Sequence, residues 1–231
     1  MSLPIHIERT RNRSSRAILR DGELFIRLAG RLSAQAEREH IDILTRRMAK
    51  AHAREVLKHR IEPFKPLLTK ENSELIIETC TGYRIHFTVT EGHKTQSKRT
   101  VDGWSVSRSP IISEKVFHRY LWKLLEISME VEIAKLVREI NARTLKVPIR
   151  SITLKFMRSR WGSCSHVGNI ALSTPLLCTT KEILEYVIIH ELAHVREMNH
   201  SKRFWAIVEE YCPEYREQMK ALKGYRVIRE R

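Results

Sequence analysis

The sequence predicts an α+β protein, and three observations lead to this fold class. Short runs of β-branched and aromatic residues, typical of strands, alternate with longer segments in which apolar residues recur at helical spacing. Glycine and proline separate many of these segments, as expected for turns. The chain has 231 residues, 42% of them hydrophobic, which suffices for one moderately large domain or two small ones.

Residues 1–147 are expected to form an N-terminal α+β portion. Two opening strands are predicted, at Ile5–Arg9 and Ala17–Leu28. The second strand bends at Asp21-Gly22, a dipeptide typical of hairpins. Ser33 is a suitable N-cap for the helix that follows, which is expected over residues 33–60.

A small antiparallel β-meander over residues 75–107 and a helix over residues 113–142 complete this portion. The strands of the meander are predicted at Leu75–Thr79, Tyr83–Thr90 and Thr100–Ser107. The helix carries an apolar stripe that is expected to face the core, because such stripes are usually buried. The stripe consists of Val116, Tyr120, Leu124, Ile127, Val131 and Leu136.

Residues 148–231 are expected to form a compact unit in which strands precede helices. Its strands are predicted at Ile152–Phe156, Trp161–Cys164 and Asn169–Ser173. Thr179 and Glu182 have the spacing of a capping box, which predicts a helix over about residues 180–197. Ser201 is expected to cap a second helix, and Pro213 to start a third.

The charge of the chain favours an anionic partner. Lys and Arg number 42 against 27 acidic residues, which gives a formal net charge of +15 at pH 7. Such an excess bears on partners and solubility rather than on fold. It would suit nucleic acid, nucleotide phosphates or an acidic protein, but a generally basic proteome would explain it equally well.

Cysteine usage and hydropathy indicate a cytoplasmic protein that works as a monomer without membrane association. The four cysteines are scattered and form no CxxC pair, which argues against a disulfide scaffold or a zinc ribbon. No apolar run approaches the roughly 20 residues that cross a bilayer. The N-terminal segment also lacks the apolar core of a secretory signal.

The most informative segment contains the motif His190-Glu191-Leu-Ala-His194. Residues four apart lie on one face of a helix, so both imidazoles can approach one metal ion at about 2 Å. Glu191 lies beside that point, where it can accept a proton from metal-activated water. The motif therefore predicts a zinc-dependent hydrolase with Glu191 as the general base.

A catalytic zinc site needs a third protein ligand and an open fourth position. His200 is the preferred candidate, provided that the helix ends after His194 and the chain folds back, which a left-handed conformation at Asn199 would assist. Glu209 or Glu210 on the following helix is the alternative third ligand.

These residues resemble the YgjP-like metallopeptidase domain, which is similar to the SprT-like and WLM domains and to minimal gluzincin-like proteases. The resemblance rests on Arg160-Trp-Gly-Ser-Cys164, Tyr186–His194, Asn199-His200-Ser201 and Phe204-Trp205. It implies a zincin-like fold, in which an antiparallel sheet packs on the active-site helix. It also implies zinc held by His190, His194 and His200, catalysis by Glu191 and a peptide or protein substrate.

Further residues are assigned roles as expectations. In zincins an edge strand pairs with extended substrate, a role open to Asn169, Ile170 and Ala171. Arg203, Tyr211 and Tyr225 are candidates for stabilising the oxyanion. Trp161 either walls the cleft or, as preferred, is an ordinary buried residue. Cys164 and His118 are expected to have structural roles.

The leading function is therefore peptide-bond hydrolysis with zinc as cofactor, and two alternatives stay open. The first is a metal-dependent nucleotide phosphohydrolase of the nucleoside triphosphate pyrophosphatase type, in which Arg150, Arg158 and Arg160 would hold phosphates. The absence of a glycine-rich phosphate loop weakens it. The second is a basic nucleic-acid-associated protease or binding protein, which the net charge favours.

Overall fold

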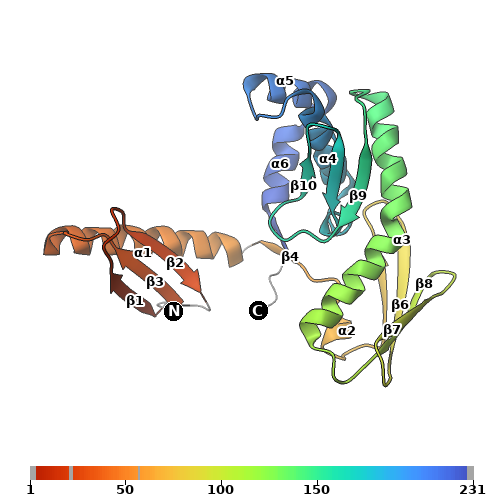
Figure 1. The fold of residues 1–231 in the computed structure, drawn as a ribbon, viewed down its shortest axis with the longest axis horizontal. Coiled ribbons are helices and arrows are strands. Elements are labelled where there is room, and N and C mark those ends of the chain that lie inside the picture. Colours follow the sequence, from red (N-terminus) through yellow and green to blue (C-terminus); the bar gives the residue numbers. More distant parts are fainter. Residues whose placement is uncertain (1–3, 21–22, 57, 228–231) are drawn as a thin grey trace. The chain divides into compact units, whose positions relative to one another are not determined.

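The structure, a computed structural model, describes residues 4–20, 23–56 and 58–227. The chain divides into two compact units, Met1–Lys58 and His59–Arg231 (Figure 1). The predicted division between residues 147 and 148 falls inside the second unit. None of the helices in the described ranges is long and apolar enough to cross a membrane.

The N-terminal unit contains three strands and one long helix. These elements are β1 (Ile5–Arg9), β2 (Arg16–Arg20), β3 (Glu23–Leu28) and α1 (Ala34–Val56). The sheet order is β1-β3-β2, with β1 parallel and β2 antiparallel to β3. The predicted hairpin dipeptide Asp21-Gly22 lies outside the described residues.

Helix α1 covers one face of this sheet. Its Ile41, Leu44 and Met48 pack against the buried side chains of β3. The Ser33 hydroxyl accepts the backbone N–H of Ala36 at 3.2 Å, as expected for its N-cap. The helix ends at Val56 rather than at residue 60, because the chain turns extended to form strand β4 (His59–Ile61).

The second unit begins with a four-stranded sheet of order β5-β6-β8-β7. Its strands are β5 (Glu74–Glu78), β6 (Arg84–Glu91), β7 (Gln96–Arg99) and β8 (Gly103–Arg108). The predicted antiparallel meander is wrong in one respect, because β6 and β8 are parallel. The short polar strand β7 gives no apolar signal in the sequence. It follows β6 in the chain but pairs with β8 at the far edge of the sheet, so β8 runs in the same direction as β6.

Helix α3 (Glu114–Arg143) packs against two of the three sheets described in the second unit, contacting β8 and β9. The predicted stripe is wrong at three of its six positions, since Val116, Ile127 and Val131 are exposed. The other three, Tyr120, Leu124 and Leu136, pack in or against the core. The buried face instead consists of Phe117, Leu121, Leu124, Leu125, Met129, Ile133, Val137 and Ile140. This helix carries apolar residues on several sides, so periodicity alone could not select the face that meets both sheets.

A second, smaller sheet lies between α3 and the helix that carries the motif. Its strands are β9 (Ser151–Lys155), β10 (Gly162–Cys164) and β11 (Asn169–Ser173), in the order β10-β11-β9. Strand β10 is antiparallel to β11, as predicted, but β9 is parallel to it, so the sheet is mixed rather than antiparallel. Figure 1 shows β9 beside α3 and β10 beside α4.

Three further helices and a closing strand follow this sheet. The 3₁₀ helix η1 (Thr174–Cys178) comes directly after β11. The elements that follow it are α4 (Lys181–Arg196), α5 (Lys202–Tyr211), α6 (Tyr215–Lys223) and β12 (Tyr225–Val227). The short helix α2 (Lys65–Leu68) lies earlier in the chain, between β4 and β5. Strand β12 pairs with β4 in parallel.

The N-cap of α4 differs from the predicted capping box. The Thr180 hydroxyl, not that of Thr179, accepts the backbone N–H of Ile183. The Thr179 hydroxyl instead donates to the carbonyl of Leu176 at 2.7 Å, which closes the preceding 3₁₀ helix. Adjacent threonines offer the same chemistry, and only the end of that helix decides which of them is the cap.

Candidate metal centre

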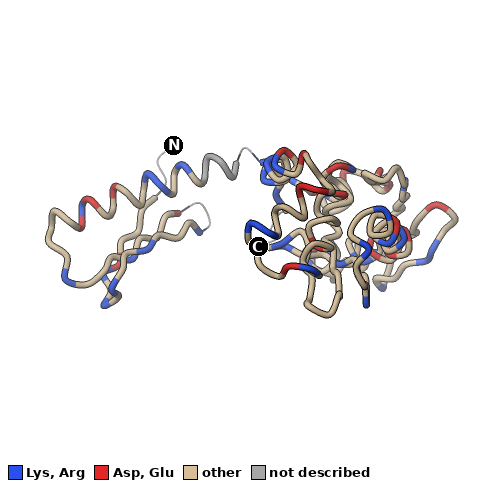
Figure 2. Tube along the Cα trace, turned by 90° about the horizontal axis from the view of Figure 1, so that it is seen from above, with Lys and Arg blue, Asp and Glu red and all other residues tan. Residues whose placement is uncertain are grey.

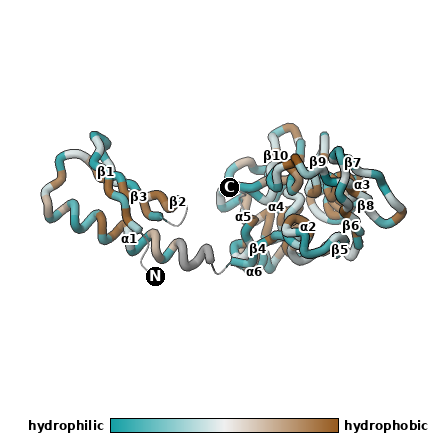
Figure 3. The backbone as a smooth tube through the Cα atoms, turned by 90° about the horizontal axis from the view of Figure 1, so that it is seen from below, coloured by the Kyte–Doolittle hydropathy of each residue, from teal (hydrophilic) through white to brown (hydrophobic). Residues whose placement is uncertain are grey.

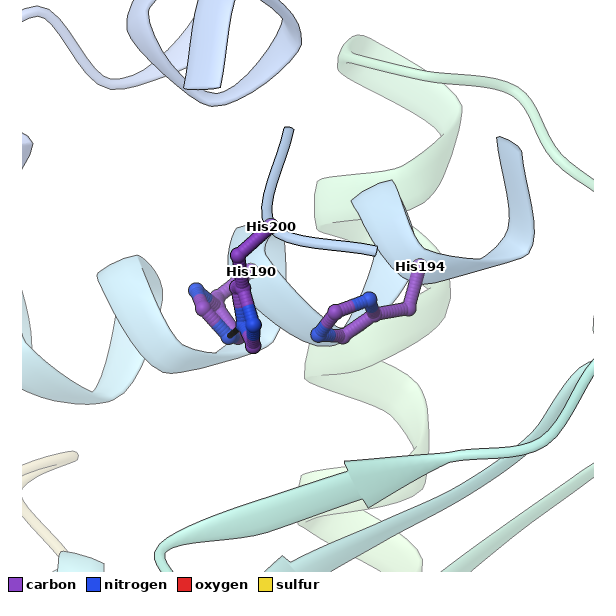
Figure 4. Close-up of side chains that lie close together, drawn as sticks. All are labelled: His190, His194 and His200. Atoms are coloured by element: carbon purple, nitrogen blue, oxygen red, sulfur yellow. Dashed lines mark hydrogen bonds between the residues drawn. The ribbon is translucent and has the colours of Figure 1, made fainter. Parts of the chain in front are cut away.

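Helix α4 directs His190 and His194 toward one point, as their spacing predicts. Their ring centroids are 4.9 Å apart (Figure 4). The Nδ1 atom of His194 lies 3.2 Å from the carbonyl oxygen of Glu197. Because a carbonyl only accepts, Nδ1 carries the proton, and the lone pair of Nε2 is available for a ligand.

His200 joins this pair from the loop after α4. Its ring centroid lies 5.0 Å from that of His190 and 4.8 Å from that of His194. The helix is terminated by Glu197 in extended conformation, and the chain turns back before α5. Asn199 is not among the described residues with positive φ, so the expected left-handed turn at this position is wrong.

The three imidazoles fit a zinc ion. The candidate ligand atoms of His190, His194 and His200 all lie within 4.8 Å of one another, and the Nε2 atoms of His190 and His200 are 3.1 Å apart. Tetrahedral zinc with bonds of 2.0–2.1 Å places two nitrogen ligands roughly 3.3 Å apart. Three nitrogen donors grouped in this way could hold a divalent metal ion.

Burial keeps the rings of His190 and His194 in the neutral form that binds metal. Burial, together with the neighbouring His194 and His200, lowers the pKa of His190 to about 3. Burial likewise lowers the pKa of His194. No proton therefore competes strongly for these two nitrogens at neutral pH.

Phe204 forms the base of the histidine cluster. Its ring is fully buried, and its centroid lies 4.9 Å from that of His190, 4.5 Å from that of His194 and 4.8 Å from that of His200. The side chain of Ser201 caps α5 by accepting the backbone N–H of Phe204 at 3.2 Å. The cap therefore fixes the residue that supports all three imidazoles.

His190 depends on this packing. Its Nδ1 atom is buried and has no hydrogen-bond partner among the described residues. Metal-binding histidines are usually oriented by a hydrogen bond from the second ring nitrogen. In this site the His190 ring is held by aromatic contacts instead. They come from Phe204 and from Tyr186, whose ring centroid is 5.9 Å from that of His190.

Glu191 lies under the edge strand β10. Its side chain is 5% exposed, and burial raises the pKa of its carboxyl group to about 8, an effect that the positive charge of Arg160 opposes. A Cβ atom at Gly162 would lie 2.7 Å from Cγ and Cδ of Glu191 and would clash with Oε1. Only glycine therefore fits at this point of β10 while Glu191 keeps its position.

Gly162 and Arg160 belong to the surroundings of Glu191, but the sequence interpretation gave neither of them this role. The adjacent Cys164 is half-buried, and burial raises the pKa of its thiol to about 11. The charge of Glu191 contributes in the same direction, so the thiol stays protonated at neutral pH. This supports the expectation that Cys164 is not a nucleophile.

The expected substrate-pairing strand is not at an edge. Asn169, Ile170 and Ala171 belong to β11, which is the middle strand and has neighbours on both sides. Ile170 and Ala171 are 1% and 7% exposed, and the Asn169 side chain accepts a hydrogen bond from Ser151 at 2.8 Å. The edge next to Glu191 is instead β10.

The other candidates lie apart from the cluster or on its rim. Arg203 is exposed on α5, and its role stays a prediction. Tyr225 is in β12, with its ring centroid 5.4 Å from that of His59. Glu209 and Glu210 are exposed on α5 and are not part of the group that the described residues offer to a metal.

His118 has a structural role in the core, as expected. It is 6% exposed on α3, and its Nε2 accepts the indole N–H of Trp122 at 2.8 Å. Burial lowers its pKa to about 4, with Arg158 contributing in the same direction. The neutral ring is therefore the form that the folded protein holds.

Comparison with known proteins identifies one family and several similar solved structures, among them two metallopeptidase zymogens. The family described as YgjP-like, metallopeptidase domain, matches residues 20–225. No curated protein matches the chain. The metallopeptidase zymogen of Methanocaldococcus jannaschii jannalysin is 25% identical over 38% of this chain and 93% of that chain, with a TM-score of 0.33. The metallopeptidase zymogen of Pyrococcus abyssi abylysin is 21% identical over 42% of this chain and 99% of that chain, with a TM-score of 0.35.

Proposed function

Since the chain belongs to the YgjP-like metallopeptidase family, we propose that it is a zinc-dependent peptidase of zincin-like fold. Its metal ligands are His190, His194 and His200, and its general base is Glu191. The observation that carries this proposal is the convergence of three imidazoles beside a buried carboxyl group. Zinc is favoured over other divalent metals because nitrogen donors and an incomplete ligand set suit it.

Each residue then has a defined part in hydrolysis. Zinc, when bound, would polarise the substrate carbonyl and lower the pKa of water to about 7. Glu191 accepts a proton from the attacking water and passes it to the amine that leaves. A cation held by the adjacent histidines favours the ionised form of this carboxyl group, against the effect of its burial.

Strand β10 is the preferred place for an extended peptide. In the antiparallel pair β10–β11, the backbone bonds of Trp161 to Ser173 and of Ser165 to Asn169 leave the polar groups of Gly162 and Cys164 pointing off the sheet. A substrate strand can pair with these groups. Because Gly162 contacts Glu191, a peptide bound there would run past the general base.

Arg160 precedes this strand and is exposed, and its charge acts on Glu191. A guanidinium group in this position can donate to a substrate carbonyl or carboxylate. It therefore joins Arg203 as a candidate for holding the substrate.

Metal analysis combined with a cleavage assay tests the proposed function. The wild-type protein should bind one zinc ion per chain and cleave a dye-labelled unfolded protein. Glu191→Gln should keep zinc but lose roughly 10²–10⁴-fold in rate, the usual contribution of a general base. The matched control is Glu210→Gln, which makes the same change on the exposed surface of α5 and should leave cleavage unchanged.

Two outcomes would contradict the proposal. One is a Glu191→Gln variant that cleaves as fast as the wild type. The other is a protein that leaves unfolded chains intact but releases phosphate or pyrophosphate from nucleoside triphosphates with Glu191 dependence. The second result would identify the nucleotide phosphohydrolase instead.

A further inference from the structure

The sheet of the N-terminal unit has one face that its helix does not cover. Helix α1 packs against Leu24, Ile26 and Leu28 of β3. Because side chains alternate along a strand, Phe25 and Arg27 point to the opposite face. Phe25 is 37% exposed and Ile18 of β2 is 54% exposed. We refer to this side of the sheet as the outer face.

A row of aromatic and aliphatic side chains crosses the centre of the outer face. The strand register places Phe25 between His6 of β1 and Ile18 of β2. The rings of His6 and Phe25 stack, with centroids 4.7 Å apart and an angle of 15° between their planes. A hollow of about 260 Å³ adjoins this row, and its lining includes Asn12. The outer face thus presents a stacked pair of aromatic rings, each partly exposed to solvent.

Positive charge flanks this row on both sides. Arg16 and Arg20 lie on the same side of β2 as Ile18 and are about 13 Å apart along the strand. The two glutamates of the outer face are already engaged. Glu8 pairs with Arg27 at 2.9 Å, and Glu23 pairs with His6 at 3.0 Å.

Arg16 and Arg20 have no ion-pair partner within residues 4–20, 23–56 and 58–227. The connection between β1 and β2 adds the exposed Arg11 and Arg13. Figure 2 shows basic segments along the strands and loops of this unit, and Figure 3 shows that hydrophobic and hydrophilic segments alternate along the strands.

We propose that the outer face binds single-stranded nucleic acid, with bases stacked on the Phe25–His6 pair and phosphates held by Arg16 and Arg20. Exposed aromatic rings can stack only on bases that are not already stacked in a duplex, which favours a single strand. The arginine side chains match the geometry and charge of phosphate groups. A lipid surface is disfavoured, because the exposed apolar residues form a single row between charges.

Fluorescence anisotropy with short labelled oligonucleotides tests this site in the full chain. Binding is measured separately for single-stranded RNA and single-stranded DNA, and the difference in affinity identifies the sugar that the site prefers. Phe25→Leu should weaken binding roughly 5- to 100-fold, the range for loss of base stacking on an aromatic ring, whereas Phe25→Tyr should bind like the wild type. The double variant Arg16→Ala/Arg20→Ala should reduce the slope of log K against log salt by about 1.4.

Matched controls separate a specific site from general attraction. Arg47→Ala/Lys50→Ala removes the same charge from the exposed surface of α1 and should bind nearly as well as the wild type. Glu191→Gln should also bind normally, because the outer face contains no residue of the metal centre. Circular dichroism and thermal melting of each variant distinguish lost contacts from lost fold.

Three results would overturn the proposal. The first is an equal loss of affinity in the α1 control and in the outer-face variants, which would indicate net charge alone. The second is a folded Phe25→Leu variant that binds oligonucleotides like the wild type. The third is tighter binding to duplex DNA or to anionic lipid vesicles than to either single strand.

Discussion

Replacing Gly162 with alanine tests whether β10 holds Glu191, the proposed general base, in position. The new Cβ atom would lie 2.7 Å from Cγ and Cδ of Glu191, whereas ordinary contacts begin near 3.4 Å. The carboxyl group must therefore move by about 0.7 Å, or β10 must lift from α4 by a similar amount. A displacement near 1 Å from productive geometry can lower a rate about 10²-fold.

We therefore expect Gly162→Ala to lose about two orders of magnitude in kcat while zinc content stays unchanged. Zinc should remain, because the atoms nearest to the added Cβ all belong to Glu191. Overpacking of this kind also costs about 1–3 kcal/mol of stability. The assay is cleavage of a dye-labelled unfolded protein, with metal analysis and a thermal melt of the same sample.

Gly82→Ala is the matched control. Gly82 has φ +85° and no heavy atom within 4 Å of an added Cβ, so the change strains the backbone without touching the site. It should cost about 1–2 kcal/mol of stability and leave kcat unchanged. If Gly162→Ala is folded, carries zinc and retains wild-type kcat, β10 does not constrain Glu191 and the reasoning is refuted.

Three further predictions concern the histidine cluster and the core. Phe204→Ala should weaken zinc binding about 10–100-fold in a chelator competition, because it removes the ring that supports all three imidazoles; unchanged affinity would contradict this role. Ser201→Ala removes the N-cap of α5 and should lower the free energy of unfolding by about 1 kcal/mol in urea titrations, with a smaller loss of zinc affinity; equal stability would argue against the cap. His118 has a pKa lowered to about 4, so between pH 6.5 and 4 the unfolded chain takes up a proton that the folded chain does not. The free energy of unfolding should fall by up to about 3 kcal/mol across that window, and His118→Leu should remove this component of the pH dependence in parallel denaturant titrations.

The sequence predicted the features of the site that depend on local geometry. His190 and His194 are four residues apart on a helix, so their side chains meet wherever that helix packs. His200 follows closely enough that a short loop returns it to the same point, although the loop does so without the expected conformation at Asn199. The helix caps predicted at Ser33 and Ser201 are equally local and are confirmed.

Features that depend on distant partners were not predictable from the sequence. The tight contact of Gly162 with Glu191 joins residues on a strand and a helix that only tertiary packing brings together. Phe204 looked like an ordinary core residue, since its three ring contacts with histidine exist only in the folded protein. The central position of β11 likewise follows from the order of strands in the sheet, which alternation of side chains does not encode.

The parallel pairing of β4 with β12 has a consequence for how the second unit is made. Residues 59–61 pair with residues 225–227. Strand β4 therefore stays unpaired after its synthesis until the ribosome has added a further 166 residues, which end with β12. Helix α6, which leads directly into β12, also packs on α4, the helix that carries His190 and Glu191. During translation α4 therefore lacks the support of α6 until residues 215–223 have been synthesised.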